Sequence, residues 1–146
     1  MTTLNFALIA GLVYLLVGIA GFVPMLLSTP PPGSPPVRFD YTYGYLFGLF
    51  PVNAAHSAVH ALLGVWGLFA AQRLGRARTY AQSLAVIYGV LTIMGLIPGL
   101  NTVFGLIPIH GHDVWLHALT GVVAAYFGFG RSRQVEVATE RTRRAA

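Results

Sequence analysis

The sequence has no cysteine and no lysine, and only 9% of its residues are charged. The absence of cysteine excludes disulfides, thiolate metal sites and cysteine nucleophiles, so any metal site must use nitrogen and oxygen ligands. The low charge and a hydrophobic fraction of 55% place the 146-residue chain with membrane proteins, as one domain. Nucleic-acid binding, the usual alternative for a basic chain, is excluded because no soluble surface is left to carry it.

Two stretches of the chain repeat each other and together hold all five histidines. They are GLFPVNAAHSAVHALLGV at 48–65 and GLIPIHGHDVWLHALTGV at 105–122. Laid over each other without a gap, they match at the following pairs: Gly48 and Gly105, Leu49 and Leu106, Pro51 and Pro108, His60 and His117, Ala61 and Ala118, Leu62 and Leu119, Gly64 and Gly121, Val65 and Val122. The same register sets His56 against Asp113 and Asn53 against His110.

A weaker similarity extends the repeat toward the N-terminus of each copy. Residues 7–24 resemble residues 81–98, with Tyr14 aligned to Tyr88. The repeat therefore predicts a tandem duplication of a two-helix hairpin, in which both halves cross the membrane in the same direction. A pseudo-two-fold axis along the membrane normal is the expected relation between such halves.

The apolar runs predict an all-α integral membrane fold with four transmembrane helices. The expected spans lie at about 6–27, 52–71, 80–97 and 112–129. The first lacks the basic start and the cleavage site of a signal peptide, so we expect it to be retained.

The segments outside the spans differ in composition. Residues 28–51 are rich in proline and tyrosine, which predicts an extended loop at the membrane surface. Residues 131–146 form a basic tail. Eight of the nine arginines lie in the turn after the second span or in this tail, so both termini are expected in the cytoplasm.

The expected location is the cytoplasmic (inner) membrane of a prokaryote, because arginine used without lysine, beside many alanines, is typical of a GC-rich prokaryotic genome. The lipid bilayer is the expected partner, and a homodimer or a larger membrane complex stays open.

The candidate site is a set of metal-ligating residues at matched depth in the second and fourth spans. His56 with His60, and Asp113 with His117, are each four residues apart and so share one face of a helix. Placing an ionisable side chain inside a span costs roughly 2.5 to 3.5 kcal/mol of insertion free energy, so such residues are rare unless they are paired or functional.

If the two helices face each other, these four groups converge on a divalent metal ion at the extracytoplasmic half of the membrane. Three histidines and a carboxylate suit zinc best, with iron or manganese as alternatives. His110 and His112 are candidate outer ligands or proton carriers. Asn53 or a backbone carbonyl is expected to orient a ligating imidazole.

Three interpretations stay open at this point. A small membrane metalloenzyme follows if the ion keeps an open position: zinc would favour hydrolysis, and iron would favour redox chemistry. A non-enzymatic accessory subunit follows if the cluster only joins helices by hydrogen bonds or senses pH. A haem protein follows if His60 and His117 are two axial ligands of one iron.

The motifs LFPVNAAHSAVH at 49–60 and IPIHGHDVWLH at 107–117 carry a family resemblance. With four apolar runs over about residues 5–130, the chain resembles the bacterial membrane family known as domain of unknown function 4383. The resemblance implies a four-helix integral membrane fold and says nothing firm about a substrate.

Overall fold

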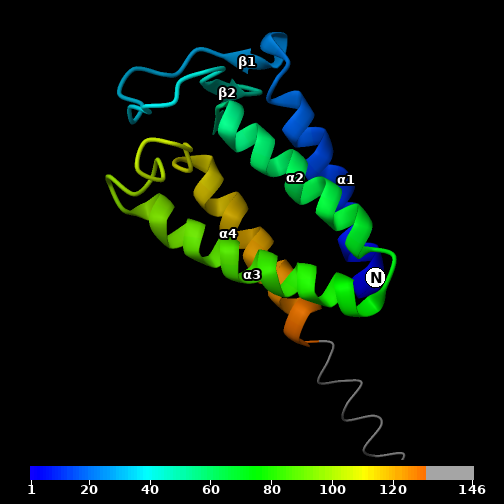
Figure 1. The fold of residues 1–146 in the computed structure, drawn as a ribbon. Helices are drawn as coiled ribbons and strands as arrows, with labels where there is room; N and C mark the ends of the chain where they lie inside the picture. The colour runs from blue at the N-terminus through cyan, green and yellow to red at the C-terminus, as the bar shows by residue number, and fades with distance from the viewer. Residues whose placement is uncertain (131–146) are drawn as a thin grey trace, which may run out of the picture.

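The computed structural model describes residues 1–130, which form two helical hairpins that pack against each other (Figure 1). In the first hairpin, α1 (Thr3–Ala20) packs along α2 (Ala54–Ala70). In the second, α3 (Leu74–Leu96) packs along α4 (His112–Ala125). The expectation of a mostly helical fold with four helices is therefore confirmed for these residues. The expected basic tail at 131–146 lies outside them.

The segment between α1 and α2 corrects the purely helical expectation. After a short 3-10 helix, η1 (Pro24–Leu26), three strands form an antiparallel sheet in the order β1 (Leu27–Ser28), β2 (Gly44–Leu46), β3 (Phe50–Val52). Pro51 pairs with Tyr45 and lies on an edge strand, where its missing N–H breaks no ladder bond. The sheet lies over the ends of α1 and α2 (Figure 1). Proline density prevents a helix here, but it leaves extended residues free to pair.

The helix ends also differ from the expected span ends. α1 ends at Ala20 instead of residue 27, because η1 begins at Pro24, which has no N–H to continue an α-helix. α3 begins at Leu74 instead of residue 80 and contains Arg76 and Arg78, because arginine is a good helix former. The tight turn expected at 72–79 is therefore confined to the residues just before Leu74.

The end of α4 widens into a π-helical turn, η2 (Tyr126–Gly130), whose carbonyls bond to other helices. Arg78 Nε and Gln82 Nε2, both on α3, donate to the Gly128 carbonyl at 3.3 and 3.1 Å. Thr3 Oγ1 on α1 donates to the Phe127 carbonyl at 3.4 Å. The first two bonds join η2 to α3 within the second hairpin, and the bond from Thr3 joins the two hairpins to each other.

Glycines allow α1 and α2 to approach closely. A Cβ added at Gly64 would lie 2.5 Å from the backbone nitrogen of Leu15, and one at Gly18 would lie 2.5 Å from that of Ala61. Small residues at such an interface let helix backbones meet, which is the main source of packing energy between helices in lipid.

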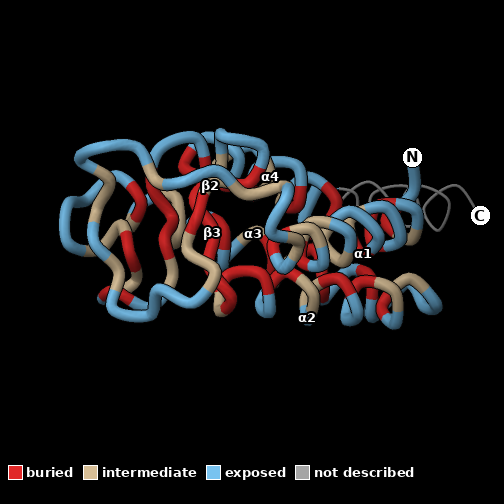
Figure 2. The backbone as a smooth tube through the Cα atoms, turned by 90° about the horizontal axis from the view of Figure 1, so that it is seen from above, coloured by how far each residue is buried: buried red, intermediate tan, exposed pale blue. Residues whose placement is uncertain are grey.

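Apolar side chains cover the outside of the helices, while buried residues face the neighbouring helices (Figure 2). Leu16, Leu62 and Val122 are 66%, 70% and 70% exposed. Among the described residues, α1 and α3 are long and apolar enough to cross a membrane, and α2 is a shorter apolar helix. Both features are those of a protein that associates with membranes.

We expect Gly64→Ala to lower the stability of the protein by about 1–3 kcal/mol, because the added methyl group would force α1 and α2 apart. The matched control is Gly89→Ala on α3, where an added Cβ meets nothing within 4 Å and the change favours the helix. Thermal unfolding in detergent would compare the two variants. Equal melting temperatures for the Gly64→Ala and Gly89→Ala proteins would contradict the close contact between α1 and α2.

Candidate metal centre

Three buried histidines meet where the two hairpins face each other. One imidazole nitrogen from each of His56, His60 and His117 lies within 4.8 Å of the other two. His56 and His60 are one turn apart on α2, with ring centroids 4.6 Å apart, and the centroid of His117 on α4 is 6.3 Å from that of His56. The convergence of α2 and α4 that the repeat predicts is therefore observed for these side chains.

The ring of His56 has a defined orientation. Its Nδ1 lies 3.2 Å from the Pro51 carbonyl oxygen, which can only accept a hydrogen bond. The bond therefore places the proton on Nδ1 and leaves a lone pair on Nε2 in the neutral ring. Nε2 in turn lies 3.8 Å from Oδ2 of Asp113, the first-turn acid of α4. Two electron-pair donors thus face each other across a gap longer than a hydrogen bond.

Further polar atoms around this gap also lack partners. Among the described residues, His60 Nδ1, His117 Nδ1 and Asp113 Oδ2 are buried and make no hydrogen bond. Buried polar atoms in folded proteins nearly always have a partner, and unpaired ones are costly. A cluster of such atoms from both hairpins marks a place where a bound ion or water would supply missing partners.

The spacing of the nitrogens fits a metal ion after a small adjustment. A Zn–N bond of about 2.1 Å puts two nitrogens of a tetrahedral site about 3.4 Å apart. Because the three nitrogens already lie within 4.8 Å of one another, small ring movements bring them to binding distance. Imidazole, carboxylate and the absence of thiolate form a ligand set that zinc accepts.

Asn53 holds the backbone on both sides of the site. Its Oδ1 accepts the backbone N–H of His56 at 2.9 Å and so caps α2. Its Nδ2 donates to the carbonyls of Phe39 and Leu106 at 2.7 and 2.8 Å. The ring of His56 is oriented by Pro51, so Asn53 fixes the start of the helix and ties the two loops together.

The two remaining histidines lie apart from the three-histidine group. His110 is buried, its Nε2 has no hydrogen-bond partner, and its ring centroid lies 6.1 Å from that of Tyr45. Burial lowers the pKa of His110 below its ordinary value. His112 is exposed beside Phe50. Their expected roles as outer ligands or proton carriers stay predictions.

Two tyrosines extend the site to the other two helices. Tyr14 on α1 lies 5.4 Å from His60, and Tyr88 on α3 lies 4.9 Å from His117, measured between ring centroids. The two tyrosine rings stack on each other at 5.7 Å. The sequence analysis assigned them no role in the site, although the repeat that aligns Tyr14 with Tyr88 as it aligns His60 with His117 already carried the signal.

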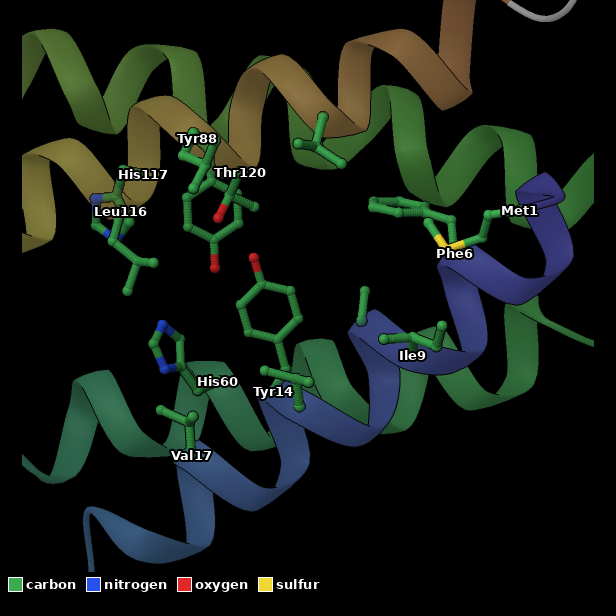
Figure 3. A pocket seen from close by; sticks show the side chains of 14 residues that line it. Met1, Phe6, Ile9, Tyr14, Val17, His60, Tyr88, Leu116, His117 and Thr120 are labelled. Carbon is green, nitrogen blue, oxygen red and sulfur yellow. The ribbon is translucent and has the colours of Figure 1, made fainter.

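A cavity of about 320 Å³ lies beside the histidines and between α1 and α4 (Figure 3). His60, His117, both tyrosines and Thr120 supply its polar lining, and the rest of the lining is apolar. His56 and Asp113 are not part of the lining, so the cluster faces the cavity through His60 and His117.

A model of one protein family matches residues 5–130 of the chain. The chain belongs to this family, described as Domain of unknown function (DUF4383). The family resemblance of the two histidine motifs is thereby confirmed. Searches of curated proteins and of solved structures found no match. Function in this DUF4383 chain must therefore be argued from the site itself.

We expect Asn53→Ser to destabilise the protein by about 2 kcal/mol or more, because serine still caps α2 but removes the donor that the buried Asn53 amide gives to the carbonyls of Phe39 and Leu106. Thr2→Ala removes the equivalent cap of α1, which has a single hydrogen bond at an exposed position, and should cost about 1 kcal/mol. Chemical unfolding of both variants in mixed micelles is the measurement. Equal losses would mean that the amide bonds of Asn53 contribute nothing.

Proposed function

We propose that this DUF4383 protein is an integral membrane metalloprotein in which His56, His60, His117 and Asp113 bind one divalent ion. The observation that carries the proposal is the group of three buried imidazoles with a nitrogen of each within 4.8 Å of the others, beside the buried and unpaired Oδ2 of Asp113. A cation would bind one nitrogen of each ring together with the carboxylate, and the apolar surroundings of the site would strengthen its attraction to the carboxylate.

Interhelical hydrogen bonding explains the cluster less well. A hydrogen bond between His56 and Asp113 needs a proton on one of the two facing atoms, and the 3.8 Å between Nε2 and Oδ2 is longer than such a bond. Pairing His56 with Asp113 would also leave Nδ1 of His60 and Nδ1 of His117 without a partner.

A single ion also explains the cluster better than haem does. His60 and His117 would have to bind opposite faces of a porphyrin. The ring of His56 lies 4.6 Å from His60 and 6.3 Å from His117, in the space that the porphyrin would need.

Zinc is the favoured ion, and hydrolysis is the chemistry that the site would support. Three imidazoles and an open fourth position are the arrangement of catalytic zinc, which lowers the pKa of bound water to about 7. His60 and His117 line the cavity, so the fourth position would face it. With Asp113 as the fourth ligand the site would be closed, whereas Asp113 beside an open position would be placed to accept a proton from water bound there. Iron or manganese in the same site would favour redox chemistry.

Equivalent contacts in the two halves support an origin by tandem duplication. Tyr14 contacts His60 as Tyr88 contacts His117. A Cβ added at Gly21 would meet the side chain of Ser57, and one at Gly95 would meet that of Val114, which is the matching residue of the second copy.

The two loops before the histidine helices also match. Phe47 and Gly48 have positive φ angles of 54° and 72°, and Phe104 and Gly105 have positive φ angles of 60° and 89°. Two successive left-handed residues are uncommon, above all at a phenylalanine. Their recurrence in equivalent loops supports two copies of one hairpin related by a pseudo-two-fold axis.

The proposed placement has four spans, with both termini in the cytoplasm of a prokaryote and the histidines in the outer half of the inner membrane. The exposed apolar side chains on α2 and α4, such as Leu62, Leu119 and Val122, support a lipid environment for these shorter helices as well as for α1 and α3. Arg73 lies in the turn between the hairpins and Arg76 lies in the first turn of α3, which supports a cytoplasmic position for this end of the hairpins.

The metal proposal is tested by metal analysis of protein purified in mild detergent without a polyhistidine tag. We expect about one equivalent of zinc, iron or manganese in the wild type and background levels in the His60→Ala, His117→Ala double variant, because each change removes one ligand.

His112→Ala is the matched control, since it removes an exposed histidine outside the group and should leave the metal in place. Circular dichroism would show that all three proteins are folded. Background metal in the wild type, or equal metal in the double variant, would overturn the proposal.

The topology is tested by single cysteines, because the natural chain has none. We expect a membrane-impermeant maleimide to label Asp40→Cys in intact spheroplasts and to label Gln72→Cys only after permeabilisation. Both positions are exposed, and α2 separates them. Labelling of both from the same side would rule out a membrane-spanning α2, and the reverse pattern would invert the orientation.

A further inference from the structure

The cavity beside the histidines has two chemically different ends (Figure 3). At one end lie the imidazoles of His60 and His117. The hydroxyl groups of Tyr14, Tyr88 and Thr120 come next and point toward one another. The other end is lined by apolar side chains that include Phe6 and Ile9. A molecule that fills this cavity must therefore be polar at one end and apolar at the other.

The apolar part of the lining reaches the outer surface of the helices. Ile9 and Val13 on α1, and Leu119 on α4, line the cavity and are also among the exposed apolar residues. In the proposed membrane placement, this surface faces the hydrocarbon core of the bilayer. A ligand can therefore enter sideways from the lipid without crossing water.

The polar end selects the chemical type of the head group. Among residues 1–130, no acidic, arginine or lysine side chain lines the cavity. Tyr14 shares hydrogen bonds with Tyr88 and Thr120, which leaves one of the three hydroxyl protons free to donate to a ligand, and the proposed metal ion beside His60 and His117 would attract negative charge. An oxygen-rich anionic group such as a carboxylate satisfies both, whereas an ammonium group would be repelled by the ion.

The size and shape of the cavity suit one chain. Its volume of about 320 Å³ is at the lower end of the range for small-molecule sites, which start at about 300 Å³. Each methylene group of a ligand that the apolar lining covers makes the free energy of binding more favourable. We propose that the cavity binds a single long-chain fatty acid, whose carboxylate lies at the hydroxyl and metal end while its tail runs past Ile9 and Val13 into the bilayer. The inference rests on the proposed function for the ion, and it names the substrate class of that site.

The test uses palmitic acid that carries a photoreactive diazirine on its chain, added to membrane vesicles containing the full chain. After irradiation, we expect mass spectrometry to find the label on α1 and α4 at cavity-lining residues. Excess palmitic acid should compete with the probe, and hexadecane, which has the same chain and no carboxylate, should not.

Two neighbouring substitutions on α1 provide a matched pair. Val13→Trp fills the cavity from its wall, and Leu12→Trp adds the same bulk at an exposed residue that does not line it. We expect the specific labelling to fall about tenfold or more in the first variant and to stay near the wild-type level in the second. The metal content of both variants should equal that of the wild type, because neither position is a ligand.

The outcomes separate the two proposals. The fatty-acid site would be overturned if the wild type contains metal but both variants are labelled equally, or if hexadecane competes with the probe. Either result would leave the metal centre standing. The metal centre would be overturned if the wild type contains only background metal. If palmitic acid then still competes with the probe and Val13→Trp abolishes the labelling, the result would support a fatty-acid site held by the three hydroxyls.

Discussion

Buried polar atoms that have no hydrogen-bond partner, gathered around three imidazoles, are the feature on which the rest of this structure depends. Nε2 of His56 and Oδ2 of Asp113 face each other at 3.8 Å, and two further imidazole nitrogens nearby have no partner. Each unpaired polar atom in an apolar interior costs free energy, and a carboxylate costs most. Under the proposed function, one bound divalent ion would offset these costs, so the stability of the helix bundle and its chemistry would share one cause.

The surrounding structure holds these donors in place. Pro51 fixes the tautomer of His56, and Asn53 fixes the start of the helix that carries it. Gly18 and Gly64 let α1 and α2 approach closely enough for Tyr14 to reach His60. The site is therefore built on helices, with the loops joined through Asn53, which is the arrangement expected of a preorganised metal centre.

The repeat in the sequence predicted the convergence of His56, His60 and His117, because spacing of four residues on two similar helices leaves few other arrangements. It did not predict the partners of Asn53, since the carbonyls of Phe39 and Leu106 are brought together only by the fold of two separate loops. The small sheet was missed for a similar reason: short strands are specified by pairing with each other more than by their own composition.

X-ray absorption spectroscopy of the zinc-loaded protein is the most direct test of the central claim, because it reports the atoms bound to the ion. The structure predicts about four nitrogen and oxygen ligands at roughly 2.0–2.1 Å, with the outer scattering of three imidazoles. An ion surrounded by about six oxygens without imidazole scattering would be an adventitious surface ion. That result would contradict the metal centre described for His56, His60, His117 and Asp113.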